Sequence, residues 1–142
     1  MINSRKFRTN QGFYIGDICY PLTDTQYEEM WGAEDYEDGE YTTKGHDWAV
    51  YGTAYGDGSY YGGGYEFSVD AGVIGIIPLE LITDEEKLEY ARELGHIVTG
   101  ELTANFETDG KGFFDIEIYD RDNKSIEQFE IDTRLEEDDE WF

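Results

Sequence analysis

Carboxylates are the side chains in this sequence that could do most chemistry. There are 34 Asp and Glu residues against 10 Lys and Arg residues, which gives a formal net charge of −24 at pH 7. A surface with this charge repels nucleic acids and anionic membranes, and it attracts cations and basic proteins. Paired carboxylates could also hydrolyse glycosides, but the sequence does not give their separation. The charge therefore indicates binding to a partner with a basic surface more directly than it indicates an enzymatic reaction.

The other reactive side chains are few and lie far apart in the sequence. Cys19 has neither a basic neighbour nor a helix N-terminus to stabilise a thiolate, which favours a small buried residue. His46 and His96 each lack the further partners that catalysis or metal binding requires. The turn DRDNKS resembles a calcium loop, but Lys124 and Ser125 stand where an oxygen ligand and a glycine are needed. We therefore expect no catalytic residue, no metal site and no cofactor.

A Gly- and Tyr-rich stretch at 56–64, GDGSYYGGG, is the segment best suited to cradle a small ligand. It lacks the lysine and the Ser or Thr of a P-loop, and no Lys or Arg occurs within 45–86. Because Gly and Asp tolerate positive φ angles, we predict two tight hairpin turns. The alternative is an aromatic pocket for a nucleotide-like ligand. Its residues would be Tyr55, Asp57, Tyr60, Tyr61 and Tyr65.

The segments around this stretch predict the centre of a β-fold. Aromatic and β-branched residues at 48–55 indicate a strand, and alternation at 65–70 indicates another. The run at 73–77 does not alternate, so we expect a strand that is buried on both faces and ended by Pro78. A further strand is predicted at 13–22.

Two capping-box patterns predict short helices. Thr23 and Gln26 have the spacing of such a box and should begin the first helix. Thr83 and Glu86 have the same spacing and should begin a second helix, from Asp84 to Leu94.

The last third of the chain predicts an antiparallel meander of strands at 101–107, 112–119 and 125–132. An Asp-Gly pair between the first two strands is a strong hairpin signal. Apolar and acidic residues alternate along the strands, so that one face should be buried and the other acidic. The acidic face would carry Glu101, Glu107, Asp115, Glu117, Glu130 and Asp132.

Two more acidic segments accompany this face. A loop at 33–40 carries Glu34, Asp35, Glu37 and Asp38, and an acidic tail occupies 135–142. Closely spaced carboxylates on a rigid sheet resemble a nucleic-acid backbone, which carries one charge per about 1.7 Å of duplex axis. The sequence thus leaves two interpretations open. The acidic surfaces either imitate nucleic acid and bind a basic groove, or they only keep the protein in solution.

Length and composition favour a single domain over residues 1–142. Its first ten residues would form a flexible arm or an edge strand. The expected fold class is α+β and mainly β, with about seven or eight strands and two short helices. The strands could form a single antiparallel-rich sheet, a sandwich or a partly open barrel. One cysteine excludes an internal disulfide, and we expect neither a signal peptide nor a membrane helix.

Three motifs resemble a group of small acidic proteins from tailed phages and prophages. They are GDICY at 16–20, GTAYGDGSY at 52–60 and VDAGVIGIIPLEL at 69–81. The resemblance implies a phage gene product in the bacterial cytoplasm, and it supplies no catalytic residues. It also favours a role against host defence enzymes that bind nucleic acid.

We therefore expect a non-enzymatic inhibitor that imitates nucleic-acid charge. It would bind the basic groove of a host protein and would not bind nucleic acid or membranes directly. Sequestration of a nucleotide-like ligand by the Tyr- and Gly-rich turns is the alternative. A hydrolase that depends on a divalent cation is the third and least favoured function.

Overall fold

The computed structural model describes residues 3–62 and 64–134, which contain eleven strands and two α-helices. The strands are β1 (Asn3–Thr9), β2 (Gly12–Gly16), β3 (Gly39–Thr43), β4 (His46–Gly52), β5 (Gly58–Gly62), β6 (Tyr65–Val69), β7 (Val73–Pro78), β8 (His96–Thr99), β9 (Leu102–Thr108), β10 (Phe113–Tyr119) and β11 (Ser125–Asp132). The helices are α1 (Asp24–Met30) and α2 (Glu85–Leu94), and 3-10 turns occupy Gly32–Glu34 and Leu79–Leu81. The α+β, mainly-β class is confirmed, with more strands than expected.

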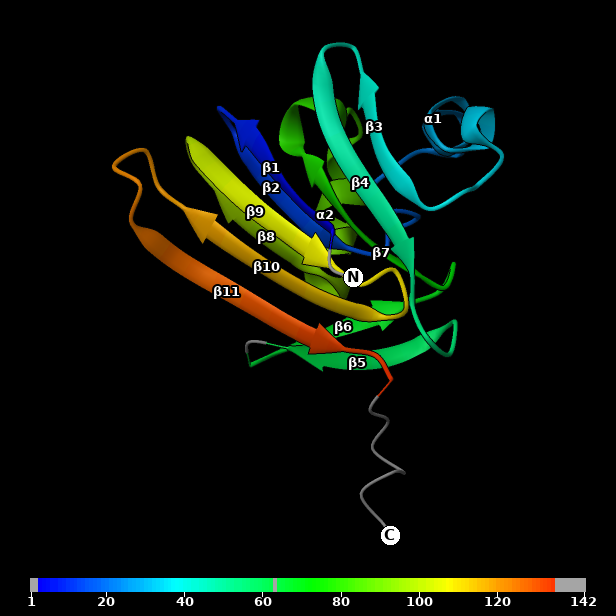
Figure 1. Ribbon diagram of the computed structural model, residues 1–142. Coiled ribbons are helices and arrows are strands. Elements are labelled where there is room, and N and C mark those ends of the chain that lie inside the picture. The colour runs from blue at the N-terminus through cyan, green and yellow to red at the C-terminus, as the bar shows by residue number, and fades with distance from the viewer. Residues whose placement is uncertain (1–2, 63, 135–142) are drawn as a thin grey trace, which may run out of the picture.

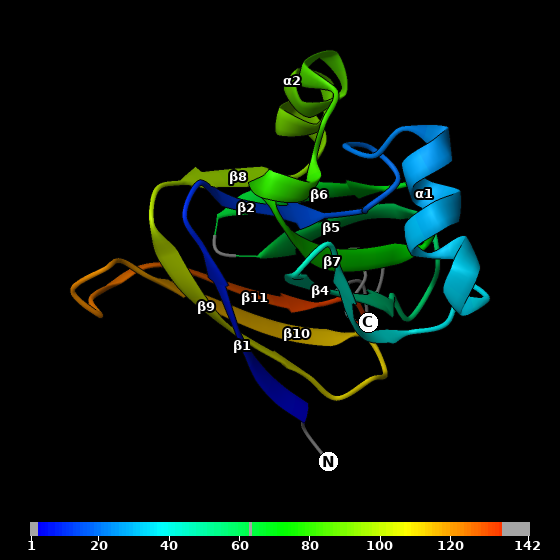
Figure 2. The same cartoon turned by 90° about the horizontal axis from the view of Figure 1, so that it is seen from above.

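Two antiparallel sheets face each other across a shared core (Figures 1 and 2). One sheet has the strand order β1-β9-β10-β11, and the other has the order β3-β4-β7-β2-β8. A two-stranded hairpin, β5-β6, packs beside β11. The sheets do not close into a barrel. Of the arrangements left open by the sequence, the structure has the sandwich.

The predicted meander is present and supplies much of the core. Its strands β9, β10 and β11 pair in antiparallel order, and their apolar positions are buried. The inward-facing residues are Leu102, Ala104, Phe106, Phe114, Ile116, Ile118, Phe129 and Ile131. The period-two pattern therefore predicted both the strands and the face that they bury.

The strand β7 lies in the middle of the five-stranded sheet, and every one of its residues is buried, as predicted. Ile74 and Ile76 pack into the core between the sheets, whereas Ile77 packs into a second cluster on the opposite face. Gly75 permits the close approach of β4, because a Cβ atom there would lie 2.3 Å from the carbonyl oxygen of Ala49. Pro78 is the last residue of the strand, where its missing N–H is tolerated.

The helix α1 covers the outer face of the five-stranded sheet. Thr23 and Gln26 form the predicted capping box at its start. Met30 and Trp31 at its end pack with Trp48 of β4 in the second cluster. This packing leaves the outer face of the four-stranded sheet on the opposite side of the molecule, as Figure 2 shows. The sequence therefore buries one sheet on both faces and the other sheet on one face only.

The cap predicted for α2 is wrong by one residue. Asp84, not Thr83, is the N-cap, and its Oδ1 accepts a hydrogen bond from the backbone N–H of Lys87 at 3.0 Å. Asp and Thr are both good N-caps, and the spacing pattern alone did not distinguish the two candidates.

The strand predicted at 13–22 ends earlier than expected, because the chain turns at Asp17. The Asp17 carboxylate is completely buried, and its Oδ1 accepts the backbone N–H of Cys19 at 2.9 Å. The N-terminal segment is better ordered than an arm, since residues 3–9 form the edge strand β1 and pair with β9 along their whole length. The predicted acidic tail at 135–142 lies outside the described residues.

Candidate functional site

The outer face of the four-stranded sheet carries a row of three carboxylates, which we call the acidic row. The pairing of β9 with β10 places Glu107 opposite Asp115, and the pairing of β10 with β11 places Asp115 opposite Glu130. Opposed side chains on neighbouring strands lie about 5 Å apart, so these like charges oppose folding. The sequence pattern predicted that the three residues face outward, and the register brings them together.

Some carboxylates of this face are engaged within the protein. Glu117 accepts hydrogen bonds from the hydroxyls of Ser125 and Tyr119, at 2.6 and 2.8 Å, and these bonds hold the pKa of Glu117 below its usual range. Asp115, at the centre of the acidic row, accepts a hydrogen bond from the Gln128 amide at 2.9 Å. The positions of both carboxylates are thus fixed by neighbouring side chains.

The two ends of the acidic row have no such neighbours. The carboxylates of Glu107 and Glu130 make no hydrogen bond or ion pair with any part of the chain that the structure describes. Glu101 differs from them, because it precedes β9 and lies 3.7 Å from the guanidinium of Arg121. Within the acidic row, Glu107 and Glu130 are therefore the carboxylates without a hydrogen-bond or ion-pair partner among the described residues.

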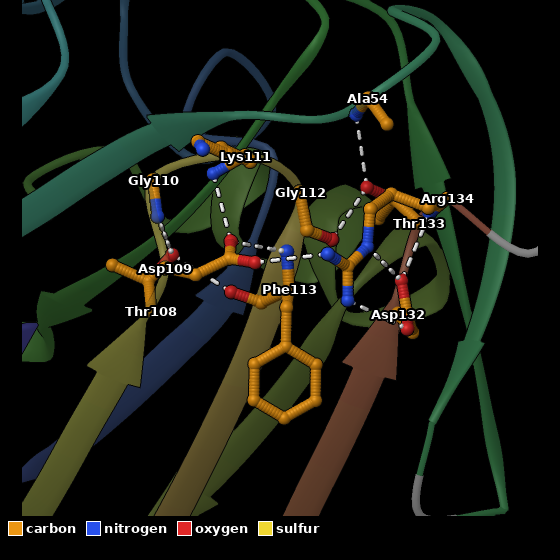
Figure 3. Close-up of polar contacts among 10 residues, drawn as sticks. All are labelled: Ala54, Thr108, Asp109, Gly110, Lys111, Gly112, Phe113, Asp132, Thr133 and Arg134. Atoms are coloured by element: carbon orange, nitrogen blue, oxygen red, sulfur yellow. Dashed lines mark hydrogen bonds and ion pairs between the residues drawn. The ribbon is translucent and has the colours of Figure 1, made fainter. Parts of the chain in front are cut away.

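Asp132 belongs to a polar network at one end of the sandwich (Figure 3). The Arg134 guanidinium donates to both carboxylate oxygens of Asp132, at 2.9 and 3.0 Å, and to Asp109 at 3.1 Å. Hydrogen bonds from Arg134 hold the pKa of Asp132 below its usual range. The buried hydroxyl of Thr133 continues the network by accepting the backbone N–H of Ala54. Asp132 was predicted to bind a partner, but its charge is already compensated.

The outer face is acidic over only part of its width. The strand β1 places Lys6 opposite Asn105 and Arg8 opposite Thr103, and both basic side chains are exposed. That these cations share a face with the acidic row could not be predicted, because the pairing of β1 with β9 joins segments about a hundred residues apart. The only available signal was the alternation of basic residues with the buried Phe7.

The acidic loop does not join the acidic row. Glu34, Asp35, Glu37 and Asp38 are all exposed, as predicted. They follow α1, which packs on the outer face of the other sheet. Figures 1 and 2 place this loop beside α1 and β3, away from the outer face of β9, β10 and β11. The molecule therefore has two separate acidic surfaces.

The Tyr- and Gly-rich turns do not gather their aromatic side chains. Tyr60 faces the core, and its hydroxyl donates to the carbonyl oxygen of Gly56 at 3.0 Å. Tyr61 is next in the strand and faces solvent, and Tyr55 and Asp57 are exposed in the loop before β5. The side chains predicted to form an aromatic pocket thus do not lie together, because Tyr60 is in the core and the others are at the surface.

Tyr65, the remaining residue of that prediction, belongs to a different cluster that joins all three sheets. Its hydroxyl donates to Glu127 of β11 at 3.2 Å, and its ring centroid lies 4.0 Å from that of His96 in β8. Nε2 of His96 lies 3.3 Å from Oε2 of Glu127, and both side chains are largely covered. Burial lowers the pKa of His96 below 6.5, although the Glu127 carboxylate acts in the opposite direction.

Acidification should therefore destabilise the fold through His96. In the unfolded chain this histidine regains a pKa of about 6.5, so the unfolded state binds the proton more readily and stability falls as the pH drops through that value. The His96→Gln variant should lose this part of the pH dependence between about pH 7.5 and 5.5. Urea unfolding at several pH values measures it. His46→Gln, which changes the other histidine, is the control, and an unchanged slope in His96→Gln would contradict the assignment.

Cys19 is half-buried and lies beside the buried Asp17. Burial raises the pKa of the thiol, and the negative charge of Asp17 raises it further. The thiol is therefore protonated at neutral pH, and it is a weak nucleophile because the thiolate is the reactive form. This environment agrees with the structural role that the sequence favoured for Cys19.

Within residues 3–62 and 64–134, no three His, Cys, Asp or Glu side chains converge as a metal site would require. The helices in the same ranges are too short or too polar to cross a bilayer. Comparison of the chain with family models, curated proteins and solved structures found no match.

Proposed function

We propose that this protein is a non-enzymatic, phage-type inhibitor that binds a basic, nucleic-acid-binding surface of a host defence protein in the bacterial cytoplasm. The acidic row of Glu107, Asp115 and Glu130 carries the proposal. It is a rigid line of negative charge on the outer face of a sheet, and its two end carboxylates have no partner among the described residues.

The register of the row favours a role in binding over a role in solubility alone. Like charges that face each other across strands destabilise a sheet, whereas solubility needs charge without any fixed arrangement. Asp115 is also held in place by Gln128, so the centre of the row is oriented before a partner arrives. A fixed arrangement lowers the entropy that is lost on binding.

The spacing of the row is close to that of a nucleic-acid backbone. Adjacent strands lie about 4.8 Å apart, and duplex DNA carries one phosphate per about 3.4 Å of axis on each strand. Three carboxylates therefore imitate a short stretch of one strand. Lys6 and Arg8 lie on β1, at the other side of the same face, and would repel a basic surface there. The partner should thus lie over β9, β10 and β11.

The test is a pair of variants with the same change in charge. Glu107→Gln with Glu130→Gln removes the free charges of the row, and Glu34→Gln with Glu37→Gln removes two charges from the separate loop. A partner captured from host lysate at low salt would be titrated with each protein. We expect the row variant to bind about tenfold more weakly, a loss of about 1.4 kcal/mol, and the loop variant to bind like the wild type.

Two further measurements complete this test. Binding should weaken as salt rises, because association between opposite charges is screened. Duplex DNA should compete with the protein for the partner. Equal losses in the two variants would mean that only net charge matters. Binding that resists salt and DNA would contradict imitation of nucleic acid altogether.

A further inference from the structure

The helix α2 presents a broad face to solvent. It packs on β6 and β8, and Ala91 is its only fully buried residue. Figure 2 shows α2 on the side of the five-stranded sheet, with the outer face of β9, β10 and β11 on the opposite side of the molecule. The exposed face of α2 is therefore separate from the acidic row. Its exposed residues are Glu85, Glu86, Glu89, Tyr90, Arg92 and Glu93.

Tyr90 is the main apolar feature of this face. At 59%, it is the most exposed large hydrophobic side chain among the described residues. Its ring meets the ring of Tyr20 edge to face, at a centroid distance of 6.1 Å and an interplanar angle of 81°. Tyr20 follows β2 and is half-buried, so it holds the Tyr90 ring from the body of the protein. The open side of the Tyr90 ring is thus a fixed aromatic surface.

Two glutamates flank Tyr90 along the helix. Glu86 lies one turn before Tyr90 and Glu93 lies one turn after it, so the three side chains are neighbours on the helix surface. Neither carboxylate makes a hydrogen bond or ion pair with the described part of the chain. Lys87 is also one turn from Tyr90, but it is half-buried. The exposed neighbours of the ring along the helix are therefore negatively charged.

The end of α2 near Tyr90 favours a cation. Glu93 lies in the last turn, where the negative end of the helix dipole disfavours an anion. The basic residue of this turn, Arg92, lies 3.4 Å from Glu89 and is engaged there. Burial and the acidic groups around Tyr20, Asp70 among them, raise the pKa of that tyrosine to about 12. A cation bound beside Glu93 would compensate the charge that the helix itself leaves unbalanced.

From this arrangement we propose that the Tyr90 face of α2 binds an arginine side chain in a basic segment of a partner protein. A guanidinium stacks flat on an aromatic ring and donates hydrogen bonds from its edge, so it can cover Tyr90 while it contacts Glu86 or Glu93. The ammonium group of lysine is a compact charge without this planar edge. Phosphate groups are repelled by the same carboxylates. This binding is independent of the acidic row and of the proposed inhibition.

An NMR titration of the isotope-labelled protein with two short peptides tests the inference. Arginines alternate with glycines in one peptide, and lysines replace the arginines in the other, so that the charges are equal. We expect the arginine peptide to bind α2 about threefold more tightly, and Tyr90→Leu to remove this preference. Tyr55→Leu is the matched control, because Tyr55 is 54% exposed in the loop before β5, and it should keep the preference.

A second pair of variants tests the carboxylates. Glu86→Gln with Glu93→Gln should weaken binding of the arginine peptide at α2 about fivefold. Glu107→Gln with Glu130→Gln removes the same charge from the acidic row. Because salt screens distant charges, this control should change binding at α2 by less than about twofold. The two pairs thus separate a failure of this inference from a failure of the proposed inhibition.

Three results would overturn the inference. They are largest shift changes on β9, β10 and β11 or in the loop 33–40, equal affinities of the two peptides at α2, and equal effects of Tyr90→Leu and Tyr55→Leu. Thermal melts show whether each variant is folded. The side chains replaced in α2 and at Tyr55 are exposed, so we expect melting temperatures close to that of the wild type.

Discussion

The Ile76→Asp variant should not fold. Ile76 is fully buried in β7, between β2 and β4, and its side chain packs into the core that both sheets share. None of the described buried residues is a Lys, Arg or His, so the new carboxylate would find no cation. An unpaired buried charge costs several kcal/mol. That cost is comparable with a total stability of about 5–15 kcal/mol.

Circular dichroism and thermal unfolding measure this outcome. Ile126→Asp is the matched control, because Ile126 lies in β11 but is 42% exposed. The same substitution there should change stability by no more than about 0.5 kcal/mol. A cooperative melt of Ile76→Asp near the wild-type temperature would mean that β7 is not at the centre of the fold.

Two groups of strands that pair with their neighbours in sequence were predicted well. The hairpin β5-β6 and the meander β9-β10-β11 are joined by short turns, so local alternation and turn residues suffice to define them. The buried strand β7 was predicted from its lack of alternation. In each case the signal lies within a few residues of the structure that it specifies.

Strands with distant partners were missed or left undecided. The strand β8 has four residues and pairs with β2, more than eighty positions earlier in the chain. The strand β3 is a different case: only Gly39 and Glu40 lie in the segment predicted to be an acidic loop, and the partner strand β4 follows β3 directly after a two-residue turn, so that a local hairpin was missed as well. Both strands are short, with four and five residues, so the strand-forming residues that they contain did not stand out as elements of their own. The choice between arm and edge strand for β1 likewise depended on β9.

The candidate sites, too, were predicted only where the signal is local in the sequence. Alternation along β9, β10 and β11 predicted which carboxylates face outward. It could not predict that Glu107 and Glu130 lack partners in the described part of the chain while Asp132 is paired with Arg134, because those contacts depend on register and side-chain conformation. The contact between Tyr20 and Tyr90 had no sequence signal, since the two residues lie far apart in the chain.

The buried carboxylate of Asp17 joins two turns that are distant in the sequence. Its Oδ1 accepts the backbone N–H of Cys19, and its Oδ2 accepts those of Asp70 and Ala71 at 2.9 and 2.6 Å. The carboxylate thus joins the turn after β2 to the turn before β7, more than fifty residues away. No Lys or Arg among the described residues forms an ion pair or hydrogen bond with this carboxylate, so three backbone N–H groups stabilise its charge.

We expect Asp17→Asn to destabilise the protein by about 2–4 kcal/mol, because an amide has one acceptor oxygen and its NH₂ group would face a backbone donor. The melting temperature should fall by roughly 10 °C for a chain of this size. Differential scanning calorimetry measures the change. Asp70→Asn, at an exposed residue whose carboxylate accepts no hydrogen bond from the described residues, removes the same charge and should melt within about 2 °C of the wild type.

Equal melting temperatures for the two variants would mean that the charge of Asp17, and not its two acceptor oxygens, determines its contribution. If the Asp17→Asn variant melts early and still in a single transition, the turns and the sandwich unfold as one cooperative unit. The reason is that Asp17 lies at the end of β2 while Ile76 lies at the centre of β7, and β2 and β7 are paired in the same sheet. Loss of the turn then weakens β2, the interior strand with which β7 pairs.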